Sequence, residues 1–516
     1  MKKDGKILGW IKANWLFSIF IIFMTIYYLI HMFTIKPWYD ELYTYFSFIS
    51  RGPVYAAIHW PVPNNHVFYS VLSAFLDYFG NPYIGLRGIS FLMAVLNLCL
   101  IYNFAIQFMN RYFAAGTSFL YASFYLVNSL SIQGRGYTLE TTCYLLALLS
   151  LYKICTKDGG VKYYVIYALS LTAGLYTIVS STFWVFPVCL IGGLFLLLQK
   201  QYQKLAKLIV TSIIAALMTL FLYGVIWLAI GSNLLSKDAE SIYYGIYQVT
   251  IILKNPIAAL TTGMNYMLAT PYVQSIARGE VIRELLGYLQ TLFNLYWQNM
   301  GTYIIILLMV SICIFGVLAW RNREKKSAFF LSLYICCSII CMPVMLIIQS
   351  VQPYKRVFAF FAVALSMVIT SIFSLAADNM KEEKWKKRIS LGMPLCLCIF
   401  AVGMLVSNMY CAPYADRENR IAEIVRAEDA ESIRAIYYTD DFQKYVLKFY
   451  YDVEPHEVSL EEADTVLVSN QQLDPNNTQV EWPVLISGRD LNLSYIRQHF
   501  QLIRESEFYS LYQREK

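Results

Sequence analysis

The sequence predicts a polytopic α-helical membrane protein with a small soluble domain at its C-terminal end. Apolar residues make up 58% of the 516 residues and charged residues 15%, against about 45 to 50% and about 25% in soluble domains. Aromatic residues reach 16%, as expected for belts of Trp and Tyr at two membrane interfaces. The formal charge of +7 is spread over the ends of apolar runs, which indicates membrane topology and excludes a nucleic-acid partner.

Eleven apolar runs are long enough to cross about 30 Å of hydrocarbon, which takes about 20 helical residues. They lie at residues 14–35, 84–108, 112–131, 138–155, 162–180, 183–199, 206–230, 301–320, 328–350, 356–377 and 389–410. The first run is too long for a signal-peptide core and has no small-residue cleavage site after it. We therefore expect it to remain as an anchor.

Orientation follows from the connections between the runs. Lys and Arg gather in alternate connections, beginning with the N-terminal segment, and positive loops stay in the cytoplasm. The N-terminus is therefore expected inside and the C-terminus outside, in a plasma membrane. The predicted transmembrane module, residues 1–411, then has long outer loops at 36–83 and 231–300.

Residues 412–516 are predicted to form a separate extracytoplasmic α/β domain, because the sequence becomes charged and cysteine-free after Cys411. Strand-like segments lie at 433–438, 465–469 and 483–487, and helix-like segments at 441–451 and 491–500. These short alternating elements favour a layered α/β packing. A Gly-rich phosphate loop after a strand is missing from the sequence, so we expect no catalysis from this domain.

Two adjacent carboxylates, Asp40 and Glu41, follow the first span directly. A carboxylate at this outer mouth can accept a proton from an attacking hydroxyl. We expect Asp40 to be such a base and Glu41 to orient the acceptor or help hold a cation. The alternative is a capped helix start, because Asp and Glu favour the first turn of a helix.

Four basic residues depart from the positive-inside trend and share the predicted outer side: Arg87, Arg135, Lys355 and Arg356. Guanidinium groups fit phosphate oxygens well, and ionisable groups at membrane margins are usually functional. We expect these residues to bind a phosphate. The alternative is that each side chain extends to the head groups of membrane lipids.

Further polar side chains on this side are Tyr43, Asn64, Asn65, His66 and Tyr137. We expect them to contact a polar substrate. For His66 two alternatives stay open, a metal ligand and a cap of the following helix. A divalent metal is thus left open as a cofactor, although five histidines in the chain make an all-histidine site improbable.

The order of these motifs resembles the membrane-embedded GT-C glycosyltransferases, in particular the group with protein O-mannosyltransferases and aminoarabinose transferases. The matching segments are Trp38–Tyr43, Asn64–Tyr69, Arg87-Gly88-Ile89-Ser90, Gln133–Tyr137 and Tyr354–Phe358. The similarity covers residues 1–160 best and is mainly architectural beyond them.

The resemblance implies an inverting transfer of a sugar from a polyprenyl-phosphate donor to an extracytoplasmic lipid, glycan or protein. It also implies that Asp40 is the general base and that the basic residues hold the donor phosphate. The rival hypothesis is a transporter or flippase for a lipid-linked or polar solute. Such a protein should show internal repeats, and the sequence has no convincing repeat.

Overall fold

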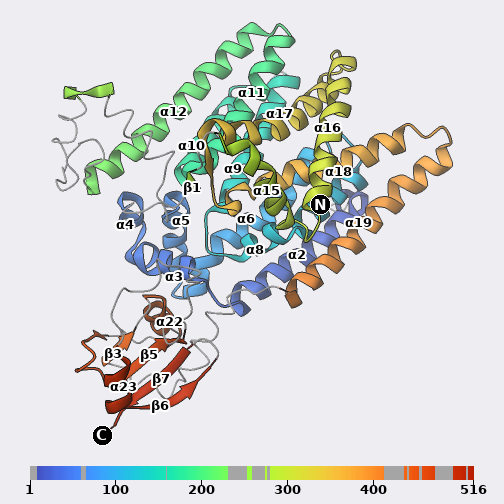
Figure 1. Ribbon diagram of the computed structural model, residues 1–516. Coiled ribbons are helices and arrows are strands. Elements are labelled where there is room, and N and C mark those ends of the chain that lie inside the picture. Colours follow the sequence, from blue (N-terminus) through green and yellow to red (C-terminus); the bar gives the residue numbers. More distant parts are fainter. Residues whose placement is uncertain are drawn as a thin grey trace. The chain divides into compact units, whose positions relative to one another are not determined.

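The computed structural model describes residues 9–59, 65–157, 160–230, 253–257, 274–275, 279–411, 435–438, 441–451, 456–470, 492–506 and 509–515. The chain divides into two compact units. One, here called the membrane unit, takes in Met1–Met32 and Arg51–Ala412, and the other, the C-terminal unit, takes in Phe33–Ser50 and Pro413–Lys516. Figure 1 shows the elements of both units along the chain.

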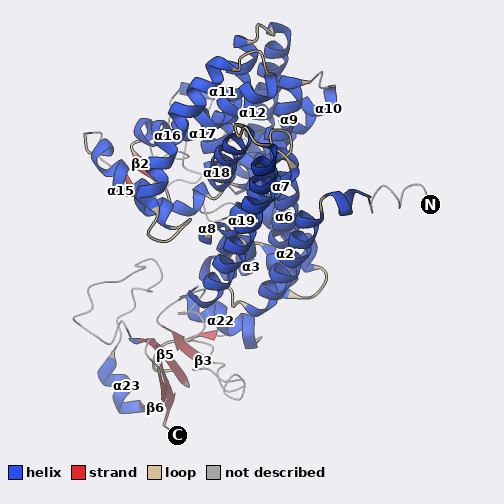
Figure 2. Ribbon diagram, turned by 90° about the vertical axis from the view of Figure 1, so that its right-hand side faces the viewer, coloured by secondary structure: helices blue, strands red, loops and turns tan. Residues whose placement is uncertain are grey.

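Long helices build the membrane unit, as Figure 2 shows. They are α2 (Trp15–Thr34), α6 (Pro82–Ala105), α7 (Arg111–Ser123), α8 (Tyr125–Ile132), α9 (Tyr137–Thr156), α10 (Val161–Thr177), α11 (Thr182–Leu198), α12 (Tyr202–Ile230), α16 (Gly301–Arg321), α17 (Lys326–Gln349), α18 (Phe361–Asp378) and α19 (Glu383–Cys411). Every predicted span falls on one of these helices, or on two in one case. Eight helical segments of the described chain are long and apolar enough to cross a membrane. An integral membrane protein is thereby confirmed, while the count of eleven spans and the orientation stay predictions.

The third predicted span is not one helix, because the chain breaks at Phe124 between α7 and α8. Phe124 has an extended backbone with φ −62° and ψ 129°. The next two amides leave the helical pattern and donate elsewhere: Tyr125 N–H to Tyr296 O at 3.0 Å and Leu126 N–H to Leu295 O at 2.9 Å. Backbone donors in apolar surroundings need partners, and here a distant segment supplies them.

Shorter elements connect the long helices. They are η1 (Ile49–Arg51), α4 (Pro53–Ile58), α5 (Val67–Asp77), η2 (Val179–Ser181), β1 (Gln274–Ser275), α15 (Val281–Asn294), β2 (Val351–Gln352) and η3 (Lys355–Phe358). Strands β1 and β2 pair antiparallel, with Gln274 opposite Gln352. This pairing ties the second long loop to the segment just before Arg356.

The C-terminal unit contains a five-stranded sheet of order β4-β3-β5-β7-β6. Its elements are β3 (Ala435–Tyr438), α22 (Asp441–Tyr451), β4 (His456–Glu457), β5 (Thr465–Ser469), α23 (Leu493–His499), β6 (Phe500–Glu505) and β7 (Tyr509–Arg514). Strand β3 runs parallel to β4 and β5, and β7 runs antiparallel to β5 and β6. The small sheet that the sequence predicts is present, and the predicted strand at 483–487 lies outside the described residues.

Side chains alternate across the sheet along β5, so the two faces have separate cores. Leu467 packs with Val446 and Leu447 of α22 on one face, and Val466 packs with Ile496 of α23 on the other. This alternation is the period-2 pattern of a strand. The unit is therefore an α/β/α sandwich.

Helix α3 (Tyr39–Ser47) also belongs to the C-terminal unit, although it follows the first span. Its Leu42 is fully buried in the cluster that contains Leu447, Leu467 and Leu511. The C-terminal domain predicted from the sequence, residues 412–516, does not include this segment. An amphipathic helix of nine residues buries its apolar side only through tertiary contacts, which the local sequence does not specify.

Candidate functional site

His66, at the start of α5, is anchored by the loop between α8 and α9. The ring is 2% exposed, and its Nδ1 accepts a hydrogen bond from the backbone N–H of Gly136 at 2.8 Å. A neutral imidazole has one acceptor and one donor nitrogen, so its proton is on Nε2. A Cβ atom on residue 136 would lie 2.9 Å from Nδ1, and this close approach requires glycine.

Arg135 meets the other side of the same ring. Its Nη2 lies 3.3 Å from Nε2 of His66, and its side chain is 2% exposed. Because Nε2 carries a proton, both nitrogens are donors and this contact is not a hydrogen bond between them. Two donors at this spacing can share one acceptor, such as an oxygen of an anion.

Arg356 and Tyr137 complete the cluster around His66. The guanidinium carbon of Arg356 lies 5.9 Å from the centre of the Tyr137 ring and 5.0 Å from that of Tyr354, within the range of cation–π contacts. The Tyr137 ring stands edge-on to His66, with centroids 4.9 Å apart. The structure thus brings together four residues that the sequence singled out, His66, Arg135, Tyr137 and Arg356.

The charge state of His66 follows from these neighbours. Burial lowers the pKa of its imidazole well below the ordinary value, and the positive charges of Arg135 and Arg356 lower the pKa further. His66 is therefore neutral near pH 7 and keeps one N–H donor. The cluster carries the positive charge of two guanidinium groups.

Helix α6 holds the loop that carries Arg135. The hydroxyl of Ser90 donates to the carbonyl of Gln133 at 2.6 Å, and the hydroxyl of Tyr69 donates to the carbonyl of Leu86 at 2.5 Å. A Cβ atom on Gly134 would lie 2.8 Å from that same carbonyl oxygen of Leu86. Glycine at this position lets the loop lie directly against α6.

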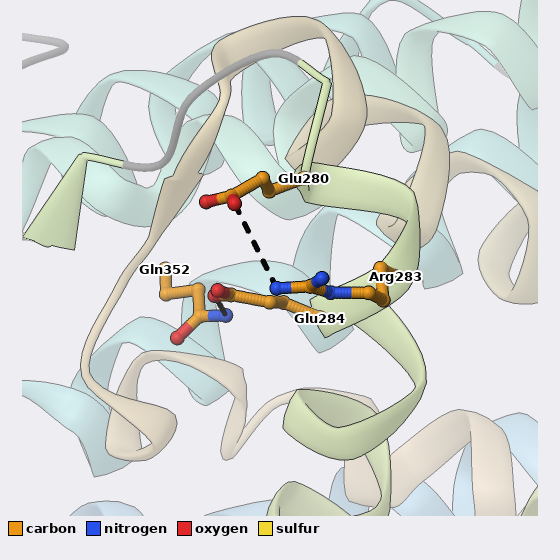
Figure 3. Close-up of polar contacts among 4 residues, drawn as sticks. All are labelled: Glu280, Arg283, Glu284 and Gln352. Atoms are coloured by element: carbon orange, nitrogen blue, oxygen red, sulfur yellow. Dashed lines mark hydrogen bonds and ion pairs between the residues drawn. The ribbon is translucent and has the colours of Figure 1, made fainter.

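Helix α15 and the tyrosine that follows it hold the segment that carries Arg356. The hydroxyl of Tyr288 donates to the carbonyl of Pro353 at 2.6 Å, and that of Tyr296 donates to the carbonyl of Phe358. Figure 3 shows Gln352, whose side-chain amide donates to Glu284 at 3.2 Å. The segment that the sequence predicts as the second outer loop is therefore part of the framework of this site.

In the same view, Arg283 of α15 forms a separate ion pair with Glu280, the N-cap residue of that helix, with 3.7 Å between nitrogen and oxygen. Both side chains are more than half exposed. An exposed pair of this kind contributes little to stability. Arg283 is therefore a useful comparison residue, because it has the same charge as Arg356 outside the cluster.

Other predicted residues of the membrane unit have different surroundings. The buried Arg87 donates to the carbonyl of Met32 at 3.1 Å, at the end of α2. The amide of Asn65 donates to the carbonyl of His59 at 2.6 Å and accepts from Ser70 at 2.7 Å. These bonds fix the path of the chain around α4 and α5.

The two remaining predicted positions of this unit are Lys355 and Asn64. Lys355 is half-buried in η3, beside Arg356. Asn64 lies outside the described residues.

Asp40, Glu41 and Tyr43 form a second group, on α3 of the C-terminal unit. The buried carboxylate of Glu41 accepts a hydrogen bond from the backbone N–H of Trp38 at 2.9 Å, so Glu41 caps the start of its own helix. Asp40 and Tyr43 are half-buried in the same helix. The helix-cap interpretation thus describes Glu41, and the role of Asp40 stays a prediction.

Glu140, one turn after Tyr137, is a buried carboxyl residue that was not predicted from the sequence. Its side chain is 1% exposed, and its Oε1 accepts hydrogen bonds from Ser181 at 3.0 Å and from the Trp184 indole at 3.1 Å. A carboxyl group inside an apolar run was the available signal. Glu140 ties the first turn of α9 to the start of α11.

The cluster is not suited to a divalent cation. Nδ1 of His66 accepts a hydrogen bond from the backbone N–H of Gly136. Nε2 faces the guanidinium group of Arg135, whose positive charge repels a cation. In the described part of the chain, no three His, Cys, Asp or Glu residues are grouped closely enough to hold a metal ion. The geometry around His66 favours an anion.

Comparisons with known proteins agree with this architecture. Residues 66–228 match the family model described as dolichyl-phosphate-mannose-protein mannosyltransferase. Among solved structures, ArnT from Cupriavidus metallidurans in the apo state matches with a TM-score of 0.57 and 10% identity over 98% of each chain. ArnT from the same organism bound to undecaprenyl phosphate matches with a TM-score of 0.53 and 10% identity, again over 98% of each chain. The search of curated proteins finds no match.

At 10% identity the likeness to ArnT shows the fold, and the family model adds a match in sequence that begins at His66 and includes Arg135 and Tyr137. The fold that the resemblance implies is thereby confirmed, and the match in sequence to the family model covers residues 66–228, less than half of the 516-residue chain.

Proposed function

We propose that this protein transfers a sugar from a polyprenyl-phosphate donor to an acceptor hydroxyl outside the cytoplasm. The observation that carries the proposal is the group of hydrogen-bond donors around His66. Its Nε2–H and Arg135 Nη2 lie 3.3 Å apart, and Arg356 adds a second guanidinium group to the same cluster. This arrangement fits the oxygens of a phosphate group.

The match to a structure of ArnT bound to undecaprenyl phosphate supports the same ligand class for this chain. A polyprenyl-phosphate donor presents its phosphate where an apolar tail meets water. The cluster lies at the starts of α5 and α9 and in the turn before α18, so its donors are at helix ends. The proposal places these ends at the extracytoplasmic face of a plasma membrane, as the distribution of Lys and Arg predicts.

The proposed reaction forms one bond and breaks one. The acceptor oxygen attacks the anomeric carbon of the sugar, and the bond from that carbon to the phosphate oxygen breaks. Its electron pair stays on the phosphate, which leaves as polyprenyl phosphate, while Asp40 takes the proton of the acceptor hydroxyl. Attack opposite the leaving group inverts the anomeric configuration.

The residues of the cluster have distinct parts in this step. Arg135, Arg356 and the Nε2–H of His66 donate to the phosphate oxygens, where negative charge increases as the bond breaks. Tyr137 holds His66 and Arg356 in place through its ring. Glu41 fixes the first turn of the helix that carries Asp40.

Mass spectrometry of surface glycans and lipids tests the proposal in cells. Four otherwise identical strains express the wild type, no protein, Asp40→Asn or Asp378→Asn. We expect one glycoform to be lost without the protein and also in Asp40→Asn, while Asp378→Asn, a change in an exposed ion pair with Lys386, retains it. Identical glycans and lipids in all strains would contradict the transferase assignment.

A further inference from the structure

Helix α3 connects the candidate base to the C-terminal unit. Asp40 is its second residue, and Leu42, two positions later, is 0% exposed in the apolar cluster with Leu447 and Leu467. Both partners belong to the chain's last 105 residues, from α22 and β5. The helix that carries Asp40 is therefore part of that unit's hydrophobic core.

Tyr445 of α22 contacts this helix through three aromatic rings. Its ring stacks on Phe46 at 5.7 Å with 9° between the planes. It also meets Tyr39 edge-on at 6.0 Å and Tyr43 edge-on at 6.1 Å. Tyr39 directly precedes Asp40, and Tyr43 lies one turn after it, so one ring contacts the helix on both sides of the carboxylate in sequence.

The next turn of α22 extends the same contact. Phe449 meets Tyr45 at 6.0 Å and Phe46 at 6.5 Å, and the ammonium group of Lys448 lies 5.2 Å from the centre of the Phe46 ring. Aromatic pairs favour defined offset and edge-on geometries. A helix held by several such pairs has a fixed rotation about its own axis, which fixes the direction of Asp40.

We infer that the C-terminal unit is a positioning element of the active site, in which Tyr445 sets the orientation of α3 and hence of Asp40. The inference rests on the proposed function, because it gives Asp40 the role of base. It assigns a task to a domain for which the sequence predicts no catalysis of its own. Truncation of the chain at residue 412 should then lower turnover, because it removes the residues that orient Asp40.

The test uses three full-length variants in proteoliposomes. Tyr445→Ala removes the ring from α3, and Tyr445→Phe restores the ring without its hydroxyl. Tyr495→Ala is the matched control: Tyr495 packs in the cluster on the opposite face of the sheet, where it contacts His499 at 4.3 Å and Phe500 at 6.5 Å. Both alanine variants delete one half-buried tyrosine ring from the same unit.

Two measurements are made on each variant. Hydrogen exchange followed by mass spectrometry reports the protection of amides in residues 39–48. Turnover is measured with undecaprenyl phosphate carrying tritiated hexose, pentose or aminopentose and a membrane extract as acceptor, and kcat and KM for the donor are separated.

We expect Tyr445→Ala to speed exchange in α3 and to lower kcat by about 10- to 100-fold, since small misplacements of a reacting group have effects of this size. KM for the sugar donor should stay within about twofold, because the residues proposed to donate hydrogen bonds to its phosphate all lie outside this unit. Tyr445→Phe should restore kcat, and Tyr495→Ala should retain it.

Three outcomes would overturn the inference: unchanged α3 exchange in Tyr445→Ala, unchanged kcat in that variant, or an equal loss of kcat in Tyr495→Ala. A wild type that turns over none of the donors would instead contradict the proposed function. Hydrogen exchange would then be the only test of whether Tyr445 orders α3. Faster α3 exchange in Tyr445→Ala, but not in Tyr495→Ala, would support this coupling.

Discussion

The backbone N–H of Gly136 donates to Nδ1 of His66 across 2.8 Å, and this bond fixes what the other side of the imidazole can do. It leaves the proton on Nε2, next to the guanidinium group of Arg135. A histidine that the sequence leaves open as a metal ligand, a substrate contact or a helix cap thus becomes a hydrogen-bond donor in a cationic cluster.

Two substitutions of His66 separate its two nitrogens. An Asn side chain can keep the acceptor for Gly136 but lacks a donor at the Nε2 position, whereas Gln reaches that position. We expect His66→Asn to weaken binding of undecaprenyl phosphate by about 10- to 100-fold, the effect of losing a hydrogen bond to a charged group, about 1.5 to 3 kcal/mol. His66→Gln should lose less affinity. Titration of both purified variants with undecaprenyl phosphate checks this order, and equal affinities for His66→Asn and wild type would remove His66 from the site.

The pKa of His66 also predicts a pH dependence of stability. The pKa is lowered in the folded protein and is about 6.5 in an unfolded chain, so the unfolded state binds the proton first as pH falls. The stability due to neutral His66 is therefore fully present above about pH 6.5 and decreases below it. Thermal unfolding at pH 7.5 and pH 5.5 should show a larger decrease in Tm for the wild type than for His66→Asn. Equal decreases in the two proteins would show that His66 does not titrate in this way.

Glu140 provides a test of the framework beneath the cluster. Gln at this position retains an Oε1 that accepts from Ser181 and Trp184, so Glu140→Gln should change the free energy of unfolding by less than about 1 kcal/mol. Glu140→Ala leaves the buried indole N–H of Trp184 without its acceptor, while the hydroxyl of Ser181 keeps the carbonyl of Gly174, and should cost about 1 to 3 kcal/mol. Thermal unfolding of both variants in the same detergent measures the difference. A Glu140→Ala variant as stable as Glu140→Gln would contradict the role given to these two hydrogen bonds.

Asp40→Asn separates catalysis from donor binding. General-base catalysis contributes about 10²- to 10⁴-fold to a rate, so transfer should decrease by at least about 100-fold. Binding of undecaprenyl phosphate should not change, because its proposed ligands are Arg135, Arg356 and His66. Turnover and binding measured on the same preparation give the comparison, with Asp378→Asn as a control. Near-normal turnover of Asp40→Asn would exclude Asp40 as the base.

Much of the membrane fold was predictable from the sequence, because hydropathy is a local property. The break at Phe124 was not, since no Pro or Gly marks it and the N–H groups that it frees are satisfied by Leu295 and Tyr296, far away in the sequence. The assignment of α3 to the C-terminal unit was likewise not predictable from the sequence. It depends on contacts between Leu42 and strands more than 400 residues later.

The candidate site was predictable in part. Basic residues against the topology trend indicated Arg135 and Arg356, and motif order indicated His66 and Tyr137. Their mutual geometry comes from tertiary packing, as does the hydrogen bond that Arg87 makes to α2. Residues that act through other residues, such as Ser90 and Glu140, carry no motif strong enough to reveal their role.

Binding of undecaprenyl phosphate to vesicle-reconstituted wild type, Arg356→Ala, Arg356→Lys and Arg283→Ala tests the phosphate site most directly. Arg283 has the same charge but lies in an exposed pair on α15. We expect Arg356→Ala to lose about 10- to 100-fold in affinity, Arg356→Lys to regain part of the loss, and Arg283→Ala to bind as the wild type does. Equal affinity of Arg356→Ala and the wild type would contradict the phosphate site.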